Sequence, residues 1–282
     1  MTKKQLTREQ LIEKMKADGI IINNNYQAKK ILQKVSYSRL NKYKPRNLAV
    51  AKKYNINLQD IYRKYEFDRQ LRLLLLEYLE KIEISLRSQI SYYHSHQYTE
   101  FGYLNADNHI KIKWHDEFKI NLKRTLSSGK EERLLAQLQN NELPLEDAID
   151  FFTFGMLSKF FNNMKTRDKK AISREVFNVN SHLIQSWLLC LTHLRNKCAH
   201  FSRLYNIEFS QIPHEYNEIK FNNTLFDYIV VLKFMLNDKS EWHGFVKKFN
   251  KLARKYKSSI NLKDLGFPKK HHNKIVLVKE MS

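Results

Sequence analysis

The residues best suited to chemistry stand together about two-thirds of the way along the chain. Arg195, Asn196 and His200 belong to the stretch Leu-Arg-Asn-Lys-Cys-Ala-His, which ends an apolar segment. Histidine, with a reference pKa of about 6.5, exchanges protons at neutral pH, and the planar guanidinium of arginine fits a phosphate. Such groups suit metal-free RNA cleavage, in which a base deprotonates the 2′-hydroxyl, an acid protonates the leaving 5′-oxygen and a cation holds the phosphate charge. That route leaves a 2′,3′-cyclic phosphate and a 5′-hydroxyl.

The spacing of these residues limits how they could act together. On a helix, Asn196 and His200 are four apart and share one face, whereas Arg195 and His200 lie about 140° apart around the axis. One protomer therefore does not obviously bring the arginine and the histidine to a single phosphate. Either the helix ends or distorts near His200, or two copies of the chain meet across a twofold axis and combine their side chains.

Structural roles remain open for the same residues. Arg195 could cap helix carbonyls, or it could pair with a carboxylate such as Glu80 or Glu83. His200 could be a buried histidine whose hydrogen bonds are satisfied within the core. In either case the motif would stabilise the fold and would carry no chemistry.

No metal or cofactor is predicted. Cys190 and Cys198 are eight residues apart, which is about 12 Å along a helix, so they do not assemble a tetrahedral zinc site with His193 and His200. We expect both cysteines to be buried thiols. The sequence also lacks a Walker loop, a dinucleotide-binding glycine motif and a Cys-x2-Cys pair.

The composition predicts a compact, helical and basic protein. The 282 residues include only 6 Gly and 4 Pro, too few for the many turns of a β fold, while 42% hydrophobic residues exclude a disordered chain. The formal net charge of +21 favours a polyanionic partner, with nucleic acid ahead of a membrane surface. The longest apolar stretches are shorter than the about 18 to 20 residues of a membrane span, and the first residues lack a signal-peptide core. A cytoplasmic protein with reduced thiols is the simplest interpretation.

Two stretches concentrate the basic residues. One runs from Lys165 to Arg174, and the other runs from Lys247 to Lys279, where eleven basic residues accompany a single acid, Asp264. Both stretches are candidates for phosphate contacts. The alternative for either is a solvated face on a basic protein.

The sequence reads as one helix after another. Thr7 and Gln10 have the spacing of a capping box, and the most periodic segment predicts a long helix over 67–94 in which Glu83 and Arg87 favour an ion pair. The other expected elements are a helix over 26–35 capped by Asn25, a connection over 37–45, a helix over 48–54, a loop over 101–115, a helix capped by Ser181 that carries the motif, and amphipathic helices over 224–235 and 242–256.

Several stretches together resemble one known family. The Arg-x4-His pattern matches the motif of HEPN nucleases, and the stretch from Leu194 to His200, followed by Arg203-Leu-Tyr-Asn, is similar to the signature of bacterial Abi-like abortive-infection proteins. Further stretches similar to landmarks of that family are Phe67-Asp-Arg-Gln-Leu-Arg, Ile82-Glu-Ile-Ser-Leu-Arg-Ser, Thr153-Phe-Gly with Leu157-Ser, and Leu265-Gly-Phe-Pro.

The resemblance implies an all-α fold, namely a compact multi-helix HEPN-like bundle with additional amino- and carboxy-terminal helices. On this view residues 1–60 form an amino-terminal helical segment packed on the core, residues 61–260 form the HEPN-like core, and residues 261–282 form a basic tail. The resemblance also implies phage defence and RNA cleavage at the interface of a homodimer.

Site roles follow from the same resemblance. We expect His200 to act as general acid and base, Arg195 to stabilise the pentavalent phosphate, and Asn196 to position these groups. The residues expected to contact RNA around them are Lys165, Arg167, Lys169, Lys170, Lys197 and Arg203. The expected partners are RNA, as substrate and as a regulatory non-coding RNA, and a second copy of the chain, with no membrane.

Two other functions compete with this one. The first is a non-catalytic RNA-binding protein held in complex with a structured regulatory RNA, which the basic carboxy-terminal helix and tail favour. The second is a helical DNA-binding regulator, although no helix-turn-helix pair with a clear glycine turn is present.

Overall fold

The computed structural model describes residues 5–44, 56–216 and 219–268. As the sequence predicts, this described part is all α. It contains three isolated β-bridges and no β-strand. The chain forms two compact units. Unit 1 comprises Met1–Leu74, Phe201–Ile207 and Val246–Ser282, and unit 2 comprises Leu75–His200 and Glu208–Phe245. The expected division at residues 60 and 260 stays a prediction.

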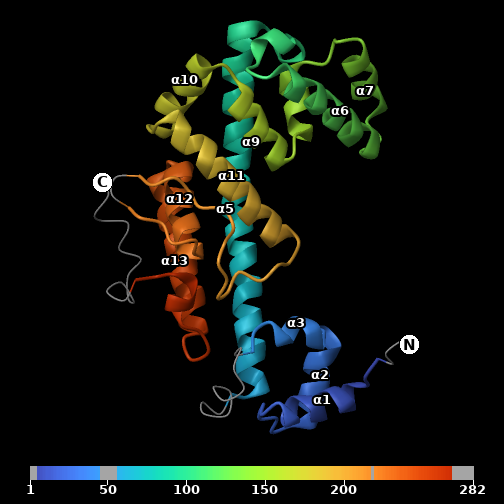
Figure 1. Ribbon diagram of the computed structural model, residues 1–282, viewed down its shortest axis with the longest axis vertical. Helices are drawn as coiled ribbons and strands as arrows, with labels where there is room; N and C mark the ends of the chain where they lie inside the picture. The colour runs from blue at the N-terminus through green and yellow to red at the C-terminus, as the bar shows by residue number, and fades with distance from the viewer. Residues whose placement is uncertain (1–4, 45–55, 217–218, 269–282) are drawn as a thin grey trace. The chain divides into compact units, whose positions relative to one another are not determined.

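The described part of unit 1 contains three short helices and parts of two longer ones (Figure 1). These elements are α1 (Arg8–Ala17), α2 (Asn25–Lys34), α3 (Tyr37–Asn41), the first part of α5 (Leu58–Tyr98), the last part of α13 (Lys239–Lys255) and a 3-10 turn (Leu262–Leu265). Thr7 and Gln10 make both hydrogen bonds of the predicted capping box. The expected helix over 48–54 lies outside the described residues.

Two details of unit 1 differ from the sequence-based expectation. Asn24, and not Asn25, caps α2, because its side-chain oxygen accepts the backbone N–H of Gln27. The segment expected as a connection contains α3, because the hydroxyl of Ser36 accepts the backbone N–H of Arg39 and so starts a helical turn.

Asp68 joins three segments of unit 1. Its carboxylate is fully buried, accepts the hydroxyl of Tyr43 at 2.6 Å and forms an ion pair with Arg72 on the next turn of α5. It also accepts the backbone N–H of Leu204 at 3.1 Å and that of Tyr205 at 2.8 Å. These hydrogen bonds connect two of the stretches that resemble the Abi-like family, the one that begins at Phe67 and the one that begins at Arg203. Asp68 thus holds the backbone that follows the Arg-x4-His motif in the chain.

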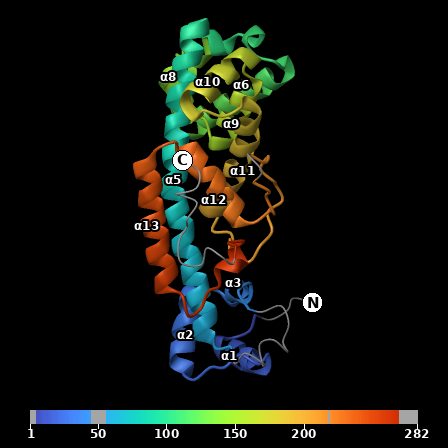
Figure 2. The same cartoon turned by 90° about the vertical axis from the view of Figure 1, so that its left-hand side faces the viewer.

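The described part of unit 2 combines the remaining part of α5 with seven further helices and the beginning of α13 (Figures 1 and 2). The seven are α6 (Ile112–Ser128), α7 (Glu132–Gln139), α8 (Leu145–Ala148), α9 (Phe154–Asn163), α10 (Thr166–Phe177), α11 (Ser181–Ala199) and α12 (Leu225–Leu236). α5 extends beyond the predicted 67–94 at both ends, and the expected loop over 101–115 contains two 3-10 turns and the start of α6.

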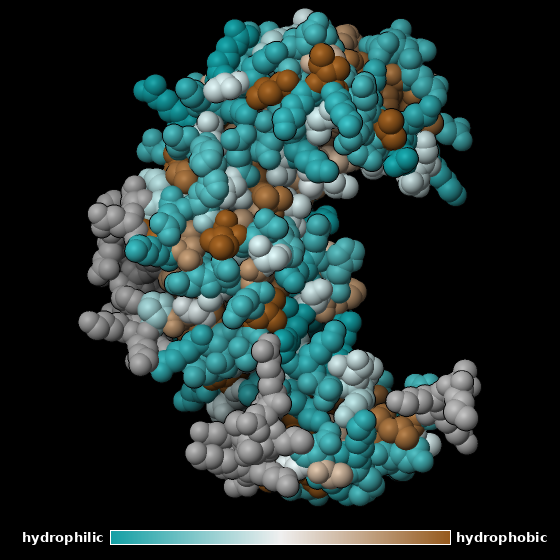
Figure 3. Space-filling model, in the orientation of Figure 1, coloured by the Kyte–Doolittle hydropathy of each residue, from teal (hydrophilic) through white to brown (hydrophobic). Residues whose placement is uncertain are grey.

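The core of unit 2 is aromatic and centres on α11, which packs against α9, α10 and α12. Trp187 of α11 is fully buried and stacks on Phe234, while Tyr78 of α5 meets Phe245 of α13 edge to face. No helix in the described part of the chain combines the length and the hydrophobicity of a membrane span. On the face seen in Figure 3, hydrophobic residues lie in small groups among hydrophilic ones.

Three histidines are buried among these aromatic rings. The carbonyl of Tyr103 lies 3.1 Å from Nε2 of His109 and 3.0 Å from Nε2 of His115. Neither ring nitrogen of His94 has a hydrogen-bond partner, and its ring stacks on that of His109 with centroids 5.7 Å apart. Burial lowers the pKa of His94 to about 3 and that of His109 to about 4. Both side chains are therefore neutral at neutral pH.

Candidate functional site

The Arg-x4-His motif occupies the carboxy-terminal end of α11. Asn180 caps the helix, not Ser181 as expected, because the side chain of Asn180 accepts the backbone N–H of His182. α11 ends at Ala199, and His200 is its C-cap, with a backbone N–H that donates to the carbonyl of Asn196 at 2.9 Å. The spacing allowed either a helix that ends or distorts near His200 or a site shared by two copies of the chain. In the structure, the helix ends at His200.

The motif side chains lie at the surface of unit 2. Asn196 and His200 are exposed, and the side chain of Arg195 is 37% exposed. His200 is thus not the buried, satisfied histidine of the structural alternative. Within the described residues, no hydrogen bond or ion pair joins Arg195 to His200. One copy of the chain presents the two groups to solvent without bringing them into contact with each other.

Arg195 does have a carboxylate neighbour, as the structural alternative anticipated. Its Nε lies 3.8 Å from Oε2 of Glu83, which is largely buried at 12% side-chain exposure. The same carboxylate accepts Nη2 of Arg87 at 2.7 Å, so the predicted pair of Glu83 and Arg87 is confirmed. Arg87 also donates to the carbonyls of Asp150 and Phe152. Glu83 is therefore held firmly by Arg87 and more loosely by Arg195.

A shallow groove of about 400 Å³ lies beside this network. It is lined by Leu76, Glu80, Glu83, Ile84, Arg87 and Arg195. Two guanidinium groups and two carboxylates nearly balance the charge of the groove. A phosphate that binds Arg195 would have to compete with Glu83, which makes this arginine weaker as an anion site than an unpaired one.

The expected RNA contacts of α10 divide by exposure. Lys170 is exposed and Lys165 is half-buried. The side chain of Arg167 is 66% exposed, and its Nε lies 3.2 Å from Oδ1 of Asp168. Lys169 is buried, and its ammonium group donates a hydrogen bond to the backbone carbonyl of Asn162 at 2.9 Å. This group therefore pairs with a carbonyl in the last turn of α9 instead of facing solvent. The structure therefore presents only part of this cluster to a phosphate.

The two other expected contacts lie in different units. In unit 2, the ammonium group of Lys197 lies 5.7 Å from the ring centroid of Phe209. Arg203 belongs to unit 1, where its guanidinium donates to the backbone carbonyl of Lys42.

His193 is a residue that the sequence reasoning connected only with a rejected zinc site. It precedes His200 by seven residues, which places both on nearly the same face of α11, about 10 Å apart along the axis. Its ring is half-buried against Phe209, and burial together with Lys197 lowers its pKa. The i, i+7 spacing in the sequence could have identified this second histidine beside the motif.

The cysteines behave as expected. Cys190 and Cys198 are buried and form no disulfide, and burial raises the pKa of the Cys190 thiol to about 12. Among the described residues, no group of three or more His, Cys, Asp or Glu side chains could hold a metal ion.

The fold and the site define an all-α protein that presents an Arg-x4-His motif at the carboxy-terminal end of a helix with one buried face. Residues 30–206 match the Abi-like protein family, and because this range covers more than half of the chain, the chain belongs to that family. The match includes the landmarks from Phe67 to Asn206, whereas the one at Leu265 lies outside it. Comparison with curated proteins and with solved structures gave no match. Membership associates the chain with abortive infection, a form of phage defence.

Proposed function

We propose that this Abi-like protein is an endoribonuclease of the HEPN type that acts in abortive infection. The observation that supports this proposal most is the exposure of Arg195 and His200 at the end of α11. Exposure is usual for arginine, and here it leaves both side chains accessible to an RNA phosphate, as a catalytic role requires. Here the end of α11 presents both side chains to solvent within the range that matches the family.

The proposed reaction needs no metal. The 2′-oxygen of a ribose attacks the adjacent phosphorus as a base takes its proton, and the bond from phosphorus to the 5′-oxygen breaks as an acid protonates that oxygen. His200 performs the proton transfers, and Arg195 stabilises the charge of the pentavalent phosphate. Asn196, one turn before His200 on the same face, positions the substrate.

Two copies of the chain would complete the site. Because no hydrogen bond or ion pair joins Arg195 to His200 within one described copy, the proposal places His200 of one copy and Arg195 of the other at the same phosphate. Mixing Arg195→Ala protein with His200→Ala protein tests this arrangement. Cleavage should return in the mixture, although each variant alone is inactive. A mixture that is as inactive as its components would rule out the shared site.

A second function has one specific observation in its favour. Arg195 already has Glu83 as a neighbour, at 3.8 Å, which is what a structural arginine in a non-catalytic RNA-binding protein would show. Such a protein would bind RNA with a strong salt dependence and would release no cleavage products.

Cleavage by point variants separates the two functions. Wild-type protein should degrade RNA in excess chelator, and His200→Ala should lower the rate by a factor of at least about 100, the usual contribution of a general acid or base. His243→Ala is the matched control, because His243 is also an exposed helical histidine and lies outside the motif. If the His200 variant cleaves as fast as the control, the proposed mechanism is wrong.

A further inference from the structure

The excess positive charge of the chain belongs to one of its two units. The sequence segments of unit 1 contain 30 Lys and Arg residues against 8 Asp and Glu residues, which gives a formal net charge of +22. The segments of unit 2 contain 20 against 21 and are close to neutral. The motif is in unit 2, so the unit that carries the candidate chemistry is not the unit that carries the charge.

Within the described part of unit 1, the outer face of α13 presents a dense group of basic residues. Phe249 and Leu252 are buried on the inner face, and Tyr256, just past the end of the helix, is buried with them. The exposed basic residues of this stretch are Lys247, Lys248, Lys251, Arg254, Lys255 and Lys257. The helical period therefore separates an apolar face that packs in unit 1 from a cationic face that meets solvent.

This stretch of the chain contributes no acid of its own to the cationic face. The sequence from Val246 to Ile260 contains no Asp or Glu. In the described part of the chain, no ion pair joins Lys247, Lys251 or Arg254 to a carboxylate. These three residues are about one turn apart and form a row about 10 Å long. Uncompensated like charges in a row repel one another, and a polyanion that lies along them removes that repulsion.

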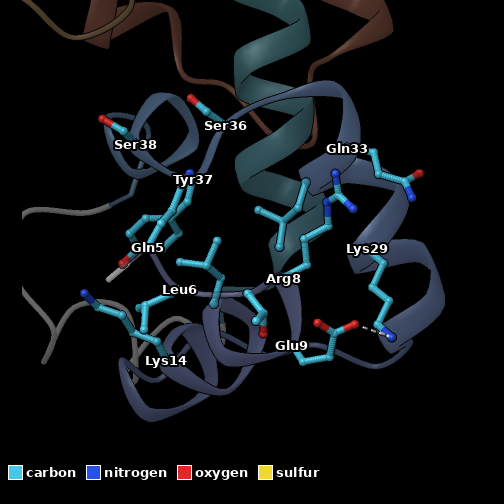
Figure 4. Close-up of a pocket in the computed structure, with 13 residues that line it drawn as sticks. Gln5, Leu6, Arg8, Glu9, Lys14, Lys29, Gln33, Ser36, Tyr37 and Ser38 are labelled. Carbon is cyan, nitrogen blue, oxygen red and sulfur yellow. Dashed lines mark ion pairs between the residues drawn. The ribbon is translucent and has the colours of Figure 1, made fainter. Parts of the chain in front are cut away.

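A second basic surface of unit 1 is more nearly compensated. A groove of about 850 Å³ lies among α1, α2 and α3, with Arg8, Lys14 and Lys29 in its lining (Figure 4). Glu9 lies in the same groove and pairs with Lys29 at 2.7 Å. Since one of its three cations is already neutralised, we consider the face of α13 the stronger site.

We propose that unit 1 is the RNA-docking unit and that the outer face of α13 binds the phosphate backbone of RNA. The choice of RNA as the polyanion rests on the proposed function, but docking does not require cleavage. This assignment differs from the sequence-based expectation, which placed the RNA contacts around the Arg-x4-His motif. The residues of that expectation are Lys165, Arg167, Lys169, Lys170, Lys197 and Arg203. A backbone contact of this kind carries little sequence preference and depends strongly on salt.

Binding by the full chain tests the proposal. The probe is a 2′-O-methylated RNA, which has no free 2′-hydroxyl and cannot be cut by the proposed route, and its affinity is measured over a range of salt concentrations. The α13 variant combines Lys247→Gln, Lys251→Gln and Arg254→Gln. Each lost phosphate contact lowers the slope of log affinity against log salt by about 0.7 to 0.9, so the slope should fall by about 2 to 3. Affinity at low salt should fall about tenfold or more.

The control variant removes three exposed cations of unit 2 by Lys113→Gln, Lys123→Gln and Arg124→Gln. Its slope and affinity should stay near those of the wild type. Equal losses in the two variants would show that only total charge matters and would overturn the proposal. Three other results would also overturn it. The α13 variant could keep the affinity and the salt slope of the wild type, or the wild type could fail to bind the methylated RNA. Poly-glutamate could also compete as well as unlabelled RNA for the protein. All six substitutions are at exposed positions, and unfolding curves confirm that both variants fold.

The outcome for docking is independent of the outcome for catalysis. If wild-type protein binds the methylated RNA through α13 but cuts no RNA, the proposed nuclease function fails and the docking surface stands. If it cuts RNA while the α13 variant binds as tightly as the wild type, the docking proposal alone fails.

Discussion

Replacing Asp68 by asparagine should loosen the backbone that follows the motif. The substitution keeps the size of the side chain and removes its charge, so the buried guanidinium of Arg72 loses its ion-pair partner. Breaking a buried pair by removing one partner costs about 3 to 5 kcal/mol. The backbone N–H groups of Leu204 and Tyr205 also lose a charged acceptor. The free energy of unfolding of unit 1 should therefore fall by about 3 kcal/mol or more.

Glu66→Gln is the matched control, because Glu66 lies two residues away on α5 and pairs with Arg69 in a partly exposed position, three residues along the same helix. A helical pair of this kind contributes about 0.3 to 0.5 kcal/mol. Urea unfolding compares the two variants, and amide hydrogen exchange at Leu204 and Tyr205 reports the local effect. Protection of these amides should drop in Asp68→Asn and persist in Glu66→Gln. Equal stability of the two variants, with both amides still protected, would refute the reasoning.

Three more predictions concern unit 2. Burial lowers the pKa of His94 to about 3 and that of His109 to about 4. Below about pH 6.5, these two histidines are therefore protonated in the unfolded chain while they are still neutral in the folded chain. The free energy of unfolding should therefore fall from pH 7 to pH 4.5 by up to about 5 kcal/mol, whereas equal urea midpoints at the two pH values would contradict this. Glu83→Gln should lower the free energy of unfolding by about 1 to 3 kcal/mol, because Arg87 loses its carboxylate, and an unchanged urea midpoint would be inconsistent with that role. Lys169→Met should leave RNA affinity in a filter-binding assay unchanged, because the ammonium group faces a carbonyl inside the protein, and a clear loss would show that it reaches the ligand.

The sequence predicts the helices well where one face is clearly apolar. The long helix α5 and the motif helix α11 follow from apolar residues at three- and four-residue steps, and the capping box at Thr7 follows from two side chains three residues apart. The five residues of α3 are too few for a periodic signal. The bonds from Asp68 to Leu204 and Tyr205 join positions more than 130 residues apart, and no local pattern contains that information.

For the candidate site, the sequence identifies the motif but not the surroundings of each side chain. Lys169 looks like its neighbour Lys170, yet it shares the buried face of α10 with Ile172 and Ser173. The helical spacing of these residues contains a signal that Lys169 points inward. The carboxylate at Arg195 was anticipated as one alternative among several, and only the fold selects Glu83.

The chemistry of the RNA ends tests the central claim most directly. RNA incubated with wild-type protein in excess chelator should give fragments with a 2′,3′-cyclic phosphate and a 5′-hydroxyl, and a single 2′-deoxy nucleotide at the cleaved position should block the cut. The same fragments should appear with His243→Ala and be missing with His200→Ala. Fragments with a 3′-hydroxyl and a 5′-phosphate, or full cleavage by the His200 variant, would contradict the account.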